Sequence, residues 1–350
     1  MKVEAGKTAT VIATLPWNKG SPWSSWSEGT LVGRDYPESS PCLQTVWDGP
    51  TITADDQAIR VFWSFCGDLW WSKSEDGETF SAPMKLPMPV STGWIEQNPT
   101  CLRDESGRYL LAFRSDREAQ HMTRAYICWS RDALNWSRPA MVIDRAVGQF
   151  GMIQDDKGRY IWADATDGKV TILSSRDAYQ WEKCAELPLD GEAAFVCILQ
   201  RNDGKYELFA ESIRYTSQDK SPERARTRVL RWLSSDRVSW TGPEILTELP
   251  SHSDGGHISA SHVDGSTFVF YCVYVGVTPM LRMFREKPGG GWDAAPSQDW
   301  FMGQHGSMSH HPRWGYMIAW SVPPFMQFPI PHKGPYFLRG KSVDQFFGPK

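Results

Sequence analysis

The sequence predicts an all-β fold, a six-bladed β-propeller whose blades are four-stranded antiparallel sheets. Three observations predict it: a Ser-x-Asp turn motif that recurs along the chain, Asp-Gly-type turns between apolar runs, and no run with the 3.6-residue apolar period of a helix. Five or seven blades are the alternatives if the repeats at the two ends are counted differently. We expect residues 1–350 to form this single domain.

The recurring motif is Ser-x-Asp followed by a closing aromatic residue. Its copies read SEDGETF, SRDALNW, SSRDAYQW, SSDRVSW, and the more degenerate KPGGGW and SVDQFF. The closing aromatics are Phe80, Trp136, Trp181, Trp240, Trp292 and Phe347, spaced by 45 to 59 residues. Ser and Asp side chains bond the backbone of their own turn, and a glycine or small residue allows left-handed backbone. We therefore interpret these aspartates as structural and not catalytic.

Each repeat contains further turns between β-rich runs, which is typical of antiparallel hairpins. These turns read DESGRY, DDKGRY, RNDGKY and HVDG. The last repeat contains only three of the four expected strands. We expect the alternating run Thr8–Leu15 to supply the fourth strand and so to close the ring.

Composition narrows the classes of function. The chain is 41% hydrophobic and 22% charged, with a net charge of −4, which gives no general footprint for nucleic acid or for a membrane surface. No Cys or His spacing resembles a zinc site, so we expect no metal and no cofactor, with a metal held by acidic and histidine side chains at the channel mouth as the alternative. The first residues lack the apolar core of a signal peptide, which leaves a cytoplasmic protein and a secreted one with its leader removed as alternatives.

The order of strands in a propeller locates a candidate site. The innermost strand of each blade starts at the mouth of the central channel, and the connection between the second and third strands opens on the same face. The expected inner-strand starts are Glu38, Glu96, Gln149, Glu192, His257 and His305. The runs HISASH and HGSMSH place His257 and His305 in equivalent positions, which makes both candidates for proton transfer.

Two long connections on that face are rich in arginine. RSDREAQHMTR contains Arg114 and Arg117, and ESIRYTSQDKSPERARTR contains Arg214, Tyr215 and Arg228. Guanidinium groups bind carboxylate or phosphate at two points, so these residues predict an anionic ligand. The alternative is a solvated loop whose arginines pair with its own acidic residues.

The repeated turns, together with GEAAFVCILQRNDGKYELFAESIR, resemble the sialidase superfamily over nearly the whole chain. The resemblance implies that Glu192 matches the carboxylate assisting the nucleophile, and that Arg214 and Arg282 match arginines that bind the substrate carboxylate. Three expected residues are absent. Ser39 and Ser40 stand where an arginine would precede Pro41, the loop SFCGD keeps only Asp68, and His305 stands where the nucleophilic tyrosine should be.

The function we expect is that of a glycoside hydrolase acting on an anionic oligo- or polysaccharide. Glu192 and Glu96 are its candidate acid, base or supporting carboxylates. SRDALNW and SRDAYQW also resemble turns of five-bladed furanosidases. A resemblance to propeller polysaccharide lyases implies a second function, in which His257 or His305 with Tyr215 abstracts a proton beside a uronate neutralised by arginine. A third alternative is a non-catalytic glycan-binding propeller.

Overall fold

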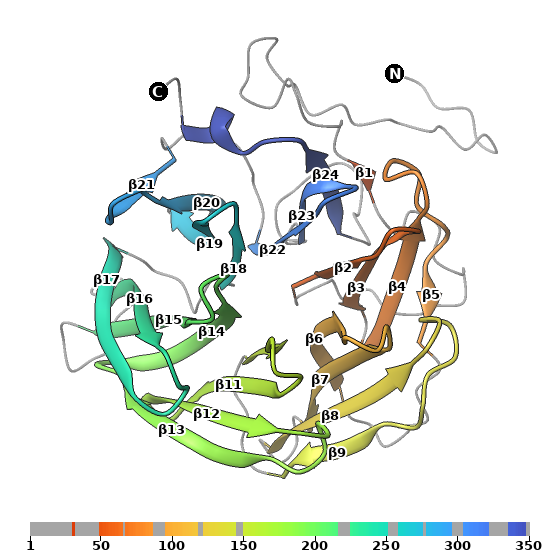
Figure 1. The fold of residues 1–350 in the computed structure, drawn as a ribbon, viewed down its shortest axis with the longest axis horizontal. Coiled ribbons are helices and arrows are strands. Elements are labelled where there is room, and N and C mark those ends of the chain that lie inside the picture. Colours follow the sequence, from red (N-terminus) through yellow and green to blue (C-terminus); the bar gives the residue numbers. More distant parts are fainter. Residues whose placement is uncertain are drawn as a thin grey trace.

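The computed structural model describes residues 30–31, 49–65, 67–86, 95–117, 122–144, 150–215, 225–250, 258–275, 278–295, 304–321 and 335–347. Within them the chain forms six four-stranded antiparallel sheets arranged around a centre (Figure 1). The predicted six-bladed propeller is therefore confirmed. The described residues contain no helix long and apolar enough to cross a membrane.

The blades follow one another in the order of the sequence. Blade 1 contains β2 (Thr51–Ala54), β3 (Ile59–Phe65), β4 (Asp68–Ser74) and β5 (Met84–Lys85), and blade 2 contains β6 (Ile95–Arg103), β7 (Tyr109–Arg117), β8 (Met122–Ser130) and β9 (Ala140–Ile143). Blade 3 contains β10 (Phe150–Gln154), β11 (Tyr160–Thr166), β12 (Lys169–Ser175) and β13 (Glu182–Pro188), and blade 4 contains β14 (Glu192–Gln200), β15 (Tyr206–Tyr215), β16 (Ala225–Ser234) and β17 (Trp240–Pro250). Blade 5 contains β18 (Ile258–Val263), β19 (Ser266–Val275), β20 (Thr278–Glu286) and β21 (Trp292–Ala294), and blade 6 contains β22 (Gln304–His311), β23 (Gly315–Ser321), β24 (Tyr336–Gly340) and β1 (Thr30–Leu31), after which comes a 3-10 helix, η4 (Asp344–Phe347).

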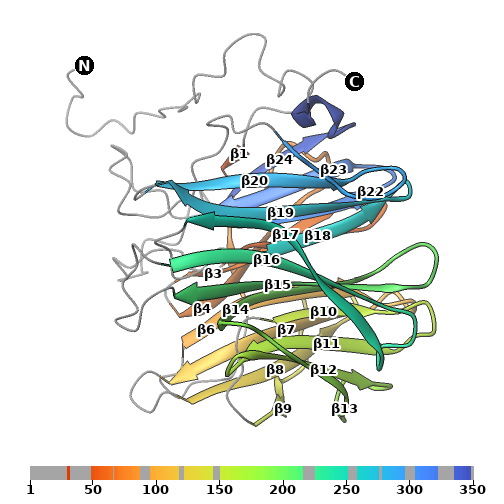
Figure 2. The ribbon, with the colours of Figure 1, turned by 90° about the vertical axis from the view of Figure 1, so that its left-hand side faces the viewer.

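The first strand of a blade lies nearest the centre and the later strands follow outward, as Figure 1 shows for β2, β6, β14, β18 and β22. Figure 2 shows the strands of blade 4 side by side, with neighbours running in opposite directions. The outermost strand of blade 6 is β1, in which Thr30 pairs with Phe337. The run Thr8–Leu15, which we expected in this position, lies outside the described residues.

The Ser-x-Asp motifs form the turns between third and fourth strands, as predicted. Asp132 Oδ1 accepts hydrogen bonds from the backbone N–H groups of Leu134 and Asn135, both at 2.8 Å. Ala133 has a φ of 59°, and the Trp136 indole donates to its carbonyl at 3.1 Å. The copies around Asp76, Asp177 and Asp236 make the same two Oδ1 bonds. Because these carboxylates are occupied by their own turns, they are scaffold.

The hydrophobic core is divided among the seams between blades. Trp63 of blade 1 and Phe337 of blade 6, both fully buried, belong to one apolar cluster. The cluster between blades 2 and 3 joins Leu110 of blade 2 to Trp162 and Phe150 of blade 3, whose rings stack with centroids 3.9 Å apart. Burying a side chain of this size stabilises the fold by roughly 1.5–3 kcal/mol. Each blade therefore depends on its neighbours, and the ring is stable as a unit.

A polar bond repeats beside these apolar seams. The hydroxyl of Tyr109 on β7 donates to Asp55, which ends the inner strand of the preceding blade. Tyr206 donates in the same way to Asp155 at 2.8 Å. A third bond of this type joins Tyr160 to Asp104 at 3.2 Å. At the ring closure, the Trp314 indole of blade 6 donates to the carbonyl of Asp55 at 2.6 Å. These bonds fix the position of each blade relative to the next one along the propeller axis.

The first bond of this series makes stability depend on pH. Burial opposes ionisation of Asp55, but hydrogen bonds from Tyr109 and from two backbone N–H groups, with the charge of Arg60, lower its pKa to about 2. Its pKa in the unfolded chain is about 3.9. Because the folded pKa is the lower one, Asp55 contributes stability that is complete above about pH 4 and is lost as the pH falls toward 2.

We expect Tyr109→Phe to lower the free energy of unfolding by about 1–3 kcal/mol at pH 7, because it leaves a buried carboxylate without its hydroxyl donor. The loss should shrink as the pH falls from 4 to 2. Urea denaturation at several pH values measures both effects. Tyr179→Phe is the control, since Tyr179 is 46% exposed. Equal stability of the Tyr109→Phe variant and the native protein at pH 7 would contradict the assignment.

Candidate functional site

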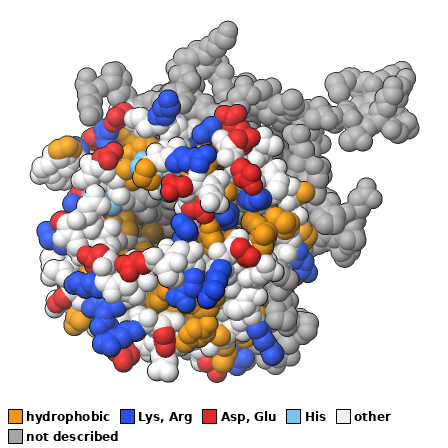
Figure 3. Space-filling view, turned by 45° about the vertical axis from the view of Figure 1, so that its right-hand side comes forward, with side chains coloured by type: hydrophobic (Ala, Val, Ile, Leu, Met, Phe, Trp, Pro, Cys, Tyr) orange, Lys and Arg blue, Asp and Glu red, His pale blue; other side chains and the backbone are white. Residues whose placement is uncertain are grey.

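The strand order separates two ends of the propeller. Glu192, which begins β14, pairs with Ile213 near the end of β15, whereas the hairpin turn joining these strands lies at the opposite end. Inner-strand starts and the second-to-third connections therefore share one end, which we call the mouth end, and the Ser-x-Asp turns lie at the other. This agrees with the prediction from sequence. A space-filling view shows a hollow within the ring, with side chains of both charges around it (Figure 3).

A compact set of charged groups lies at the mouth end of blade 4. Arg228 on β16 donates through Nη2 to the carbonyl oxygen of Asp190 at 2.6 Å and to its Oδ2 at 3.0 Å. Arg214 on β15 lies with Nη1 3.6 Å from the same Oδ2. We call Asp190, Arg214 and Arg228 the blade-4 clamp. Two arginines that the sequence placed in an anion-binding group thus meet around one carboxylate.

A glycine makes this approach possible. Gly191 has a φ of 131°, and a Cβ at this position would lie 2.5 Å from the carbonyl oxygen of Ile213. Only glycine permits such a conformation at this distance. The close approach also lets the Ser212 hydroxyl donate to the Asp190 carbonyl at 2.8 Å. Asp190 is in this way held over the ends of β15 and β16.

The members of the clamp differ in exposure. The Arg228 side chain is 9% exposed, whereas those of Arg214 and Asp190 are 56% and 67% exposed. Glu192, two residues after Asp190, is exposed as well. Arg228 is therefore a fixed, nearly desolvated cation with a solvent-accessible partner. A carboxylate or phosphate from solution could take the place of the Asp190 carboxylate on both guanidinium groups.

The other predicted site residues come from several blades. Tyr215 follows Arg214 on β15 and is half-buried. Arg114 lies on β7 and Arg282 on β20, and the described contacts join neither to the clamp. The backbone of β6 contains Glu96, that of β7 Arg117 and that of β22 His305. His257 lies outside the described residues, as does Glu38.

Three inner strands carry an irregularity near the mouth end. The register shifts between Gln97 and Thr100 in β6, in β14 between Ala193 and Val196, and in β22 between Gln304 and Ser307. Such bulges are over-represented next to active sites, where they redirect side chains. They occur in blades 2, 4 and 6, whose second and third strands are separated by 4, 9 and 14 residues, compared with 2 residues in each of the other blades.

Asn98, in the bulge of β6, was missed by sequence reasoning. Its φ is 52°, it is 5% exposed, and neither atom of its side-chain amide has a hydrogen-bond partner. A buried amide without partners costs free energy, so such groups occur at sites completed by water or ligand. The only signal in the sequence is the Asn-Pro pair at 98–99, which marks irregular backbone but not its purpose.

A buried tyrosine–carboxylate pair joins blades 4 and 5. The Tyr271 hydroxyl donates to Glu211 Oε1 at 2.7 Å, and both residues are at most 1% exposed. Burial, and after it the negative charge of Glu211, raise the pKa of Tyr271 well above its usual value. A tyrosine in this environment stays protonated and has no access to solvent. We therefore assign the pair to the seam and not to chemistry.

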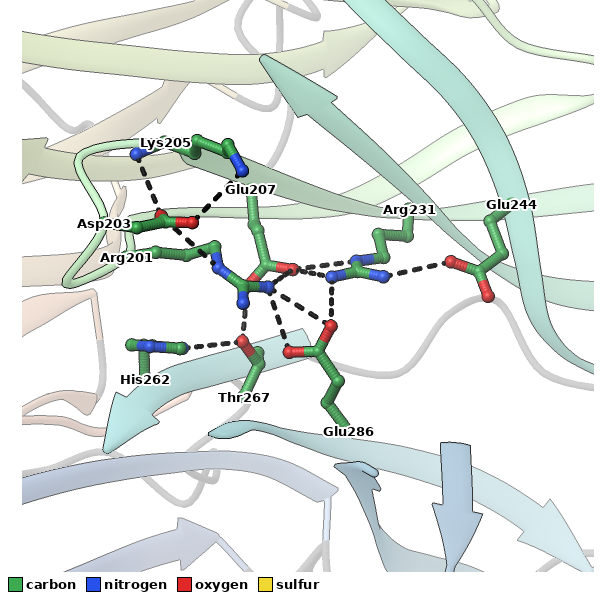
Figure 4. Close-up of polar contacts among 9 residues, drawn as sticks. All are labelled: Arg201, Asp203, Lys205, Glu207, Arg231, Glu244, His262, Thr267 and Glu286. Carbon is green, nitrogen blue, oxygen red and sulfur yellow. Dashed lines mark hydrogen bonds and ion pairs between the residues drawn. The ribbon is translucent and has the colours of Figure 1, made fainter. Parts of the chain in front are cut away.

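The same seam contains a denser polar cluster toward the opposite end (Figure 4). Fully buried Glu207 accepts from Arg231 Nε at 2.8 Å and from Arg201 Nη1 at 3.2 Å. Glu286 of blade 5 accepts from the same two arginines, at 2.7 and 2.9 Å. Two arginines and two glutamates thus balance each other across the seam. Despite burial, the arginines keep the pKa of Glu286 below its usual value.

The same cluster contains three side chains whose ligand atoms are close enough together to bind one metal ion. Ligand atoms of Glu207, Glu286 and His262 lie within 4.8 Å of one another. However, Thr267 donates to Glu207 and contacts His262 Nδ1 at 2.9 Å, and the arginines occupy both carboxylates. Burial, and after it the charge of Arg201, lower the pKa of His262, so the ring is neutral at pH 7. The guanidinium groups already supply the positive charge that a cation would bring, and we assign the cluster to the scaffold.

Comparisons by sequence identify no relative. No protein-family model matches the chain, and no match was found among curated proteins.

Solved structures do resemble it. A protein of unknown function from Dyadobacter fermentans DSM 18053 has a TM-score of 0.64 at 14% identity, covering 91% of this chain and 100% of its own. NanB, solved with Optactamide, has a TM-score of 0.63 at 10% identity, covering 86% and 69%. An exo-β-1,3-galactanase from Phanerochaete chrysosporium, solved with β-1,3-galactotriose, has a TM-score of 0.53 at 10% identity, covering 83% and 80%. The chain thus shares its propeller architecture with a glycoside hydrolase.

The cluster in Figure 4 yields a test of its structural role. We expect Glu207→Gln to lower the free energy of unfolding by about 3–5 kcal/mol, because Arg201 and Arg231 would lose the one fully buried carboxylate that they share. Chemical denaturation at pH 7 measures this loss. Lys205→Ala is the control, since its one ion-pair partner among the described residues is the exposed Asp203, and it should change stability by less than about 1 kcal/mol. Similar losses for both variants would contradict the assignment.

Proposed function

We propose that this protein is a carbohydrate-active enzyme, a glycoside hydrolase of sialidase-like fold that binds an anionic glycan at the mouth end. The observation that carries the proposal is the blade-4 clamp. Arg214 and Arg228 converge on a single carboxylate, and that carboxylate is exposed. The propeller shared with an exo-β-1,3-galactanase supports the class of enzyme, and the sialidase-like sequence of blade 4 supports the anionic ligand.

In this proposal Asp190 stands in for the substrate in the unliganded protein. A sugar carboxylate would replace it on Arg228, whose nearly buried guanidinium is already held in place and loses little freedom on binding. Arg214, which is more exposed, would complete the two-point contact. The clamp thereby orients the sugar ring relative to the inner-strand residues of blade 4.

Glu192 is the carboxylate best placed to act on a ligand held there. It begins the inner strand two residues after Asp190, and it is exposed at the same end. Its proposed role is to assist hydrolysis as acid, base or supporting carboxylate, with Glu96 as a second carboxylate and His257 and His305 as proton-transfer groups. Arg114, Arg117, Arg282 and Tyr215 are proposed to extend the binding surface.

Product analysis tests the class of reaction. Incubation with sialosides, uronate-containing and sulfated glycans, followed by mass spectrometry, should show products that have gained one water. Glu192→Ala should lower turnover at least 100-fold and leave substrate affinity within a few-fold, as expected for a group that acts in the transition state. Glu182→Ala, an exposed glutamate at the opposite end, is the control and should keep full activity.

Two other results would overturn the proposal. Products without added water that carry an unsaturated uronate would establish a lyase, with the histidines as the bases to test. Binding of a glycan without any cleavage would establish a binding propeller.

A further inference from the structure

A groove of about 610 Å³ lies between blades 2 and 3, toward the outside of the ring. Its walls come from the end of β9 in blade 2 and, in blade 3, from β12, β13 and the turn that joins β11 to β12. The volume falls within the range of small-ligand sites, roughly 300–1,000 Å³. Neither the clamp nor any residue proposed above for catalysis lines it. We call it the seam groove.

The seam groove exists because the outermost strand of blade 2 is shorter than that of blade 3. The outer strand of blade 2 has four residues and pairs with β8 only from Ala125 to Ile127. The outer strand of blade 3 has seven residues and continues until Pro188 pairs with Lys169. The outer part of blade 3 therefore extends past the end of β9, and part of its surface has no strand of blade 2 packed against it. The groove is a consequence of the different lengths of these two outer strands.

The floor of the groove is apolar. Val142, Leu173 and Trp181 line it, and Leu173 is 8% exposed. The Trp181 ring is held in place by its own turn, because its indole donates to the Ala178 carbonyl at 2.9 Å. A fixed aromatic ring with aliphatic neighbours is a surface on which the apolar face of a sugar ring can pack.

The rim is charged, and each of its charged residues except Asp167 has an ion-pair partner among the described residues. Lys169 and Lys183 both contact Glu186 Oε2, at 3.2 and 3.5 Å. Asp144 is paired with Arg124 at 2.6 Å. An anionic ligand would have to break one of these pairs to reach a lysine, and Asp167 would repel it. A neutral ligand would not have to break a pair, since each lysine ammonium has three N–H groups and keeps donors for hydroxyl oxygens, while the carboxylates accept from hydroxyl groups.

We propose that the seam groove is a second carbohydrate site, which binds a neutral oligosaccharide. The apolar floor with its fixed indole ring can pack against the apolar faces of sugar rings. The ion-paired groups of the rim can donate hydrogen bonds to the sugar hydroxyls and accept hydrogen bonds from them. The clamp has the opposite character, because its buried arginine selects negative charge. The groove proposal stands independently of the clamp, since no residue is shared.

Isothermal titration with β-1,3-galactotriose, cellohexaose and xylohexaose tests this site. We expect at least one of them to bind with a Kd in the millimolar range or tighter. The double variant Lys169→Ala/Lys183→Ala should weaken that binding at least fivefold. Val142→Trp, which fills the groove from a partly exposed position, should weaken it further. Thermal melting monitored by circular dichroism confirms that both variants are folded.

Two controls separate the groove from the clamp. Lys157→Ala removes an exposed lysine at the opposite end of blade 3, and Arg214→Ala removes a member of the clamp. Both should bind the neutral sugar as the native protein does. Binding that survives in the groove variants, or is lost in Arg214→Ala, would overturn the groove proposal and leave the proposed function standing. Absence of binding by all three oligosaccharides would overturn it as well.

Discussion

The bond from one blade to the carboxylate of the preceding blade is the constraint on which this ring depends. Tyr109, Tyr160 and Tyr206 each place a hydroxyl on an aspartate across a seam, next to apolar clusters that no blade could bury alone. Because the hydrophobic effect is not directional, packing alone would allow neighbouring blades to slide. A hydrogen bond with fixed geometry sets their relative height, and through it the height of every strand end around the channel.

Blade 4 departs from this pattern at both ends. Where the preceding inner strands end in aspartate, its inner strand is followed by Arg201, and the simple bond is replaced by the four-charge cluster with Glu207, Arg231 and Glu286. At the mouth end, the same blade contains the clamp and a bulged inner strand. The cluster and the clamp lie at opposite ends of the same two strands, so the strands that carry Arg214 and Arg228 are held at their far ends by Glu207 and Arg231.

Sequence reasoning reached the fold, the role of the Ser-x-Asp turns and the end of the ring that holds the arginines, because turns and periodic strands leave local signals. It grouped Arg214 with Arg228, which both contact Asp190, but it assigned no role to Asp190, since the approach that joins them depends on Gly191 and on Ile213 across the sheet. It also missed Asn98 and the pair Tyr271–Glu211. These depend on contacts between strands or blades, and no local pattern in the chain records them.

The claim that the clamp exchanges its own carboxylate for that of a ligand is tested most directly by binding measurements on Asp190→Asn. Removing the internal competitor while keeping the residue's shape should tighten binding of a carboxylate-bearing glycan about fivefold, which corresponds to roughly 1 kcal/mol. Arg214→Ala should weaken it about tenfold, and Asp293→Asn, at the opposite end, should leave it unchanged. Weaker or unchanged binding in Asp190→Asn would contradict the account, because Asp190 would then support the site and not compete for it.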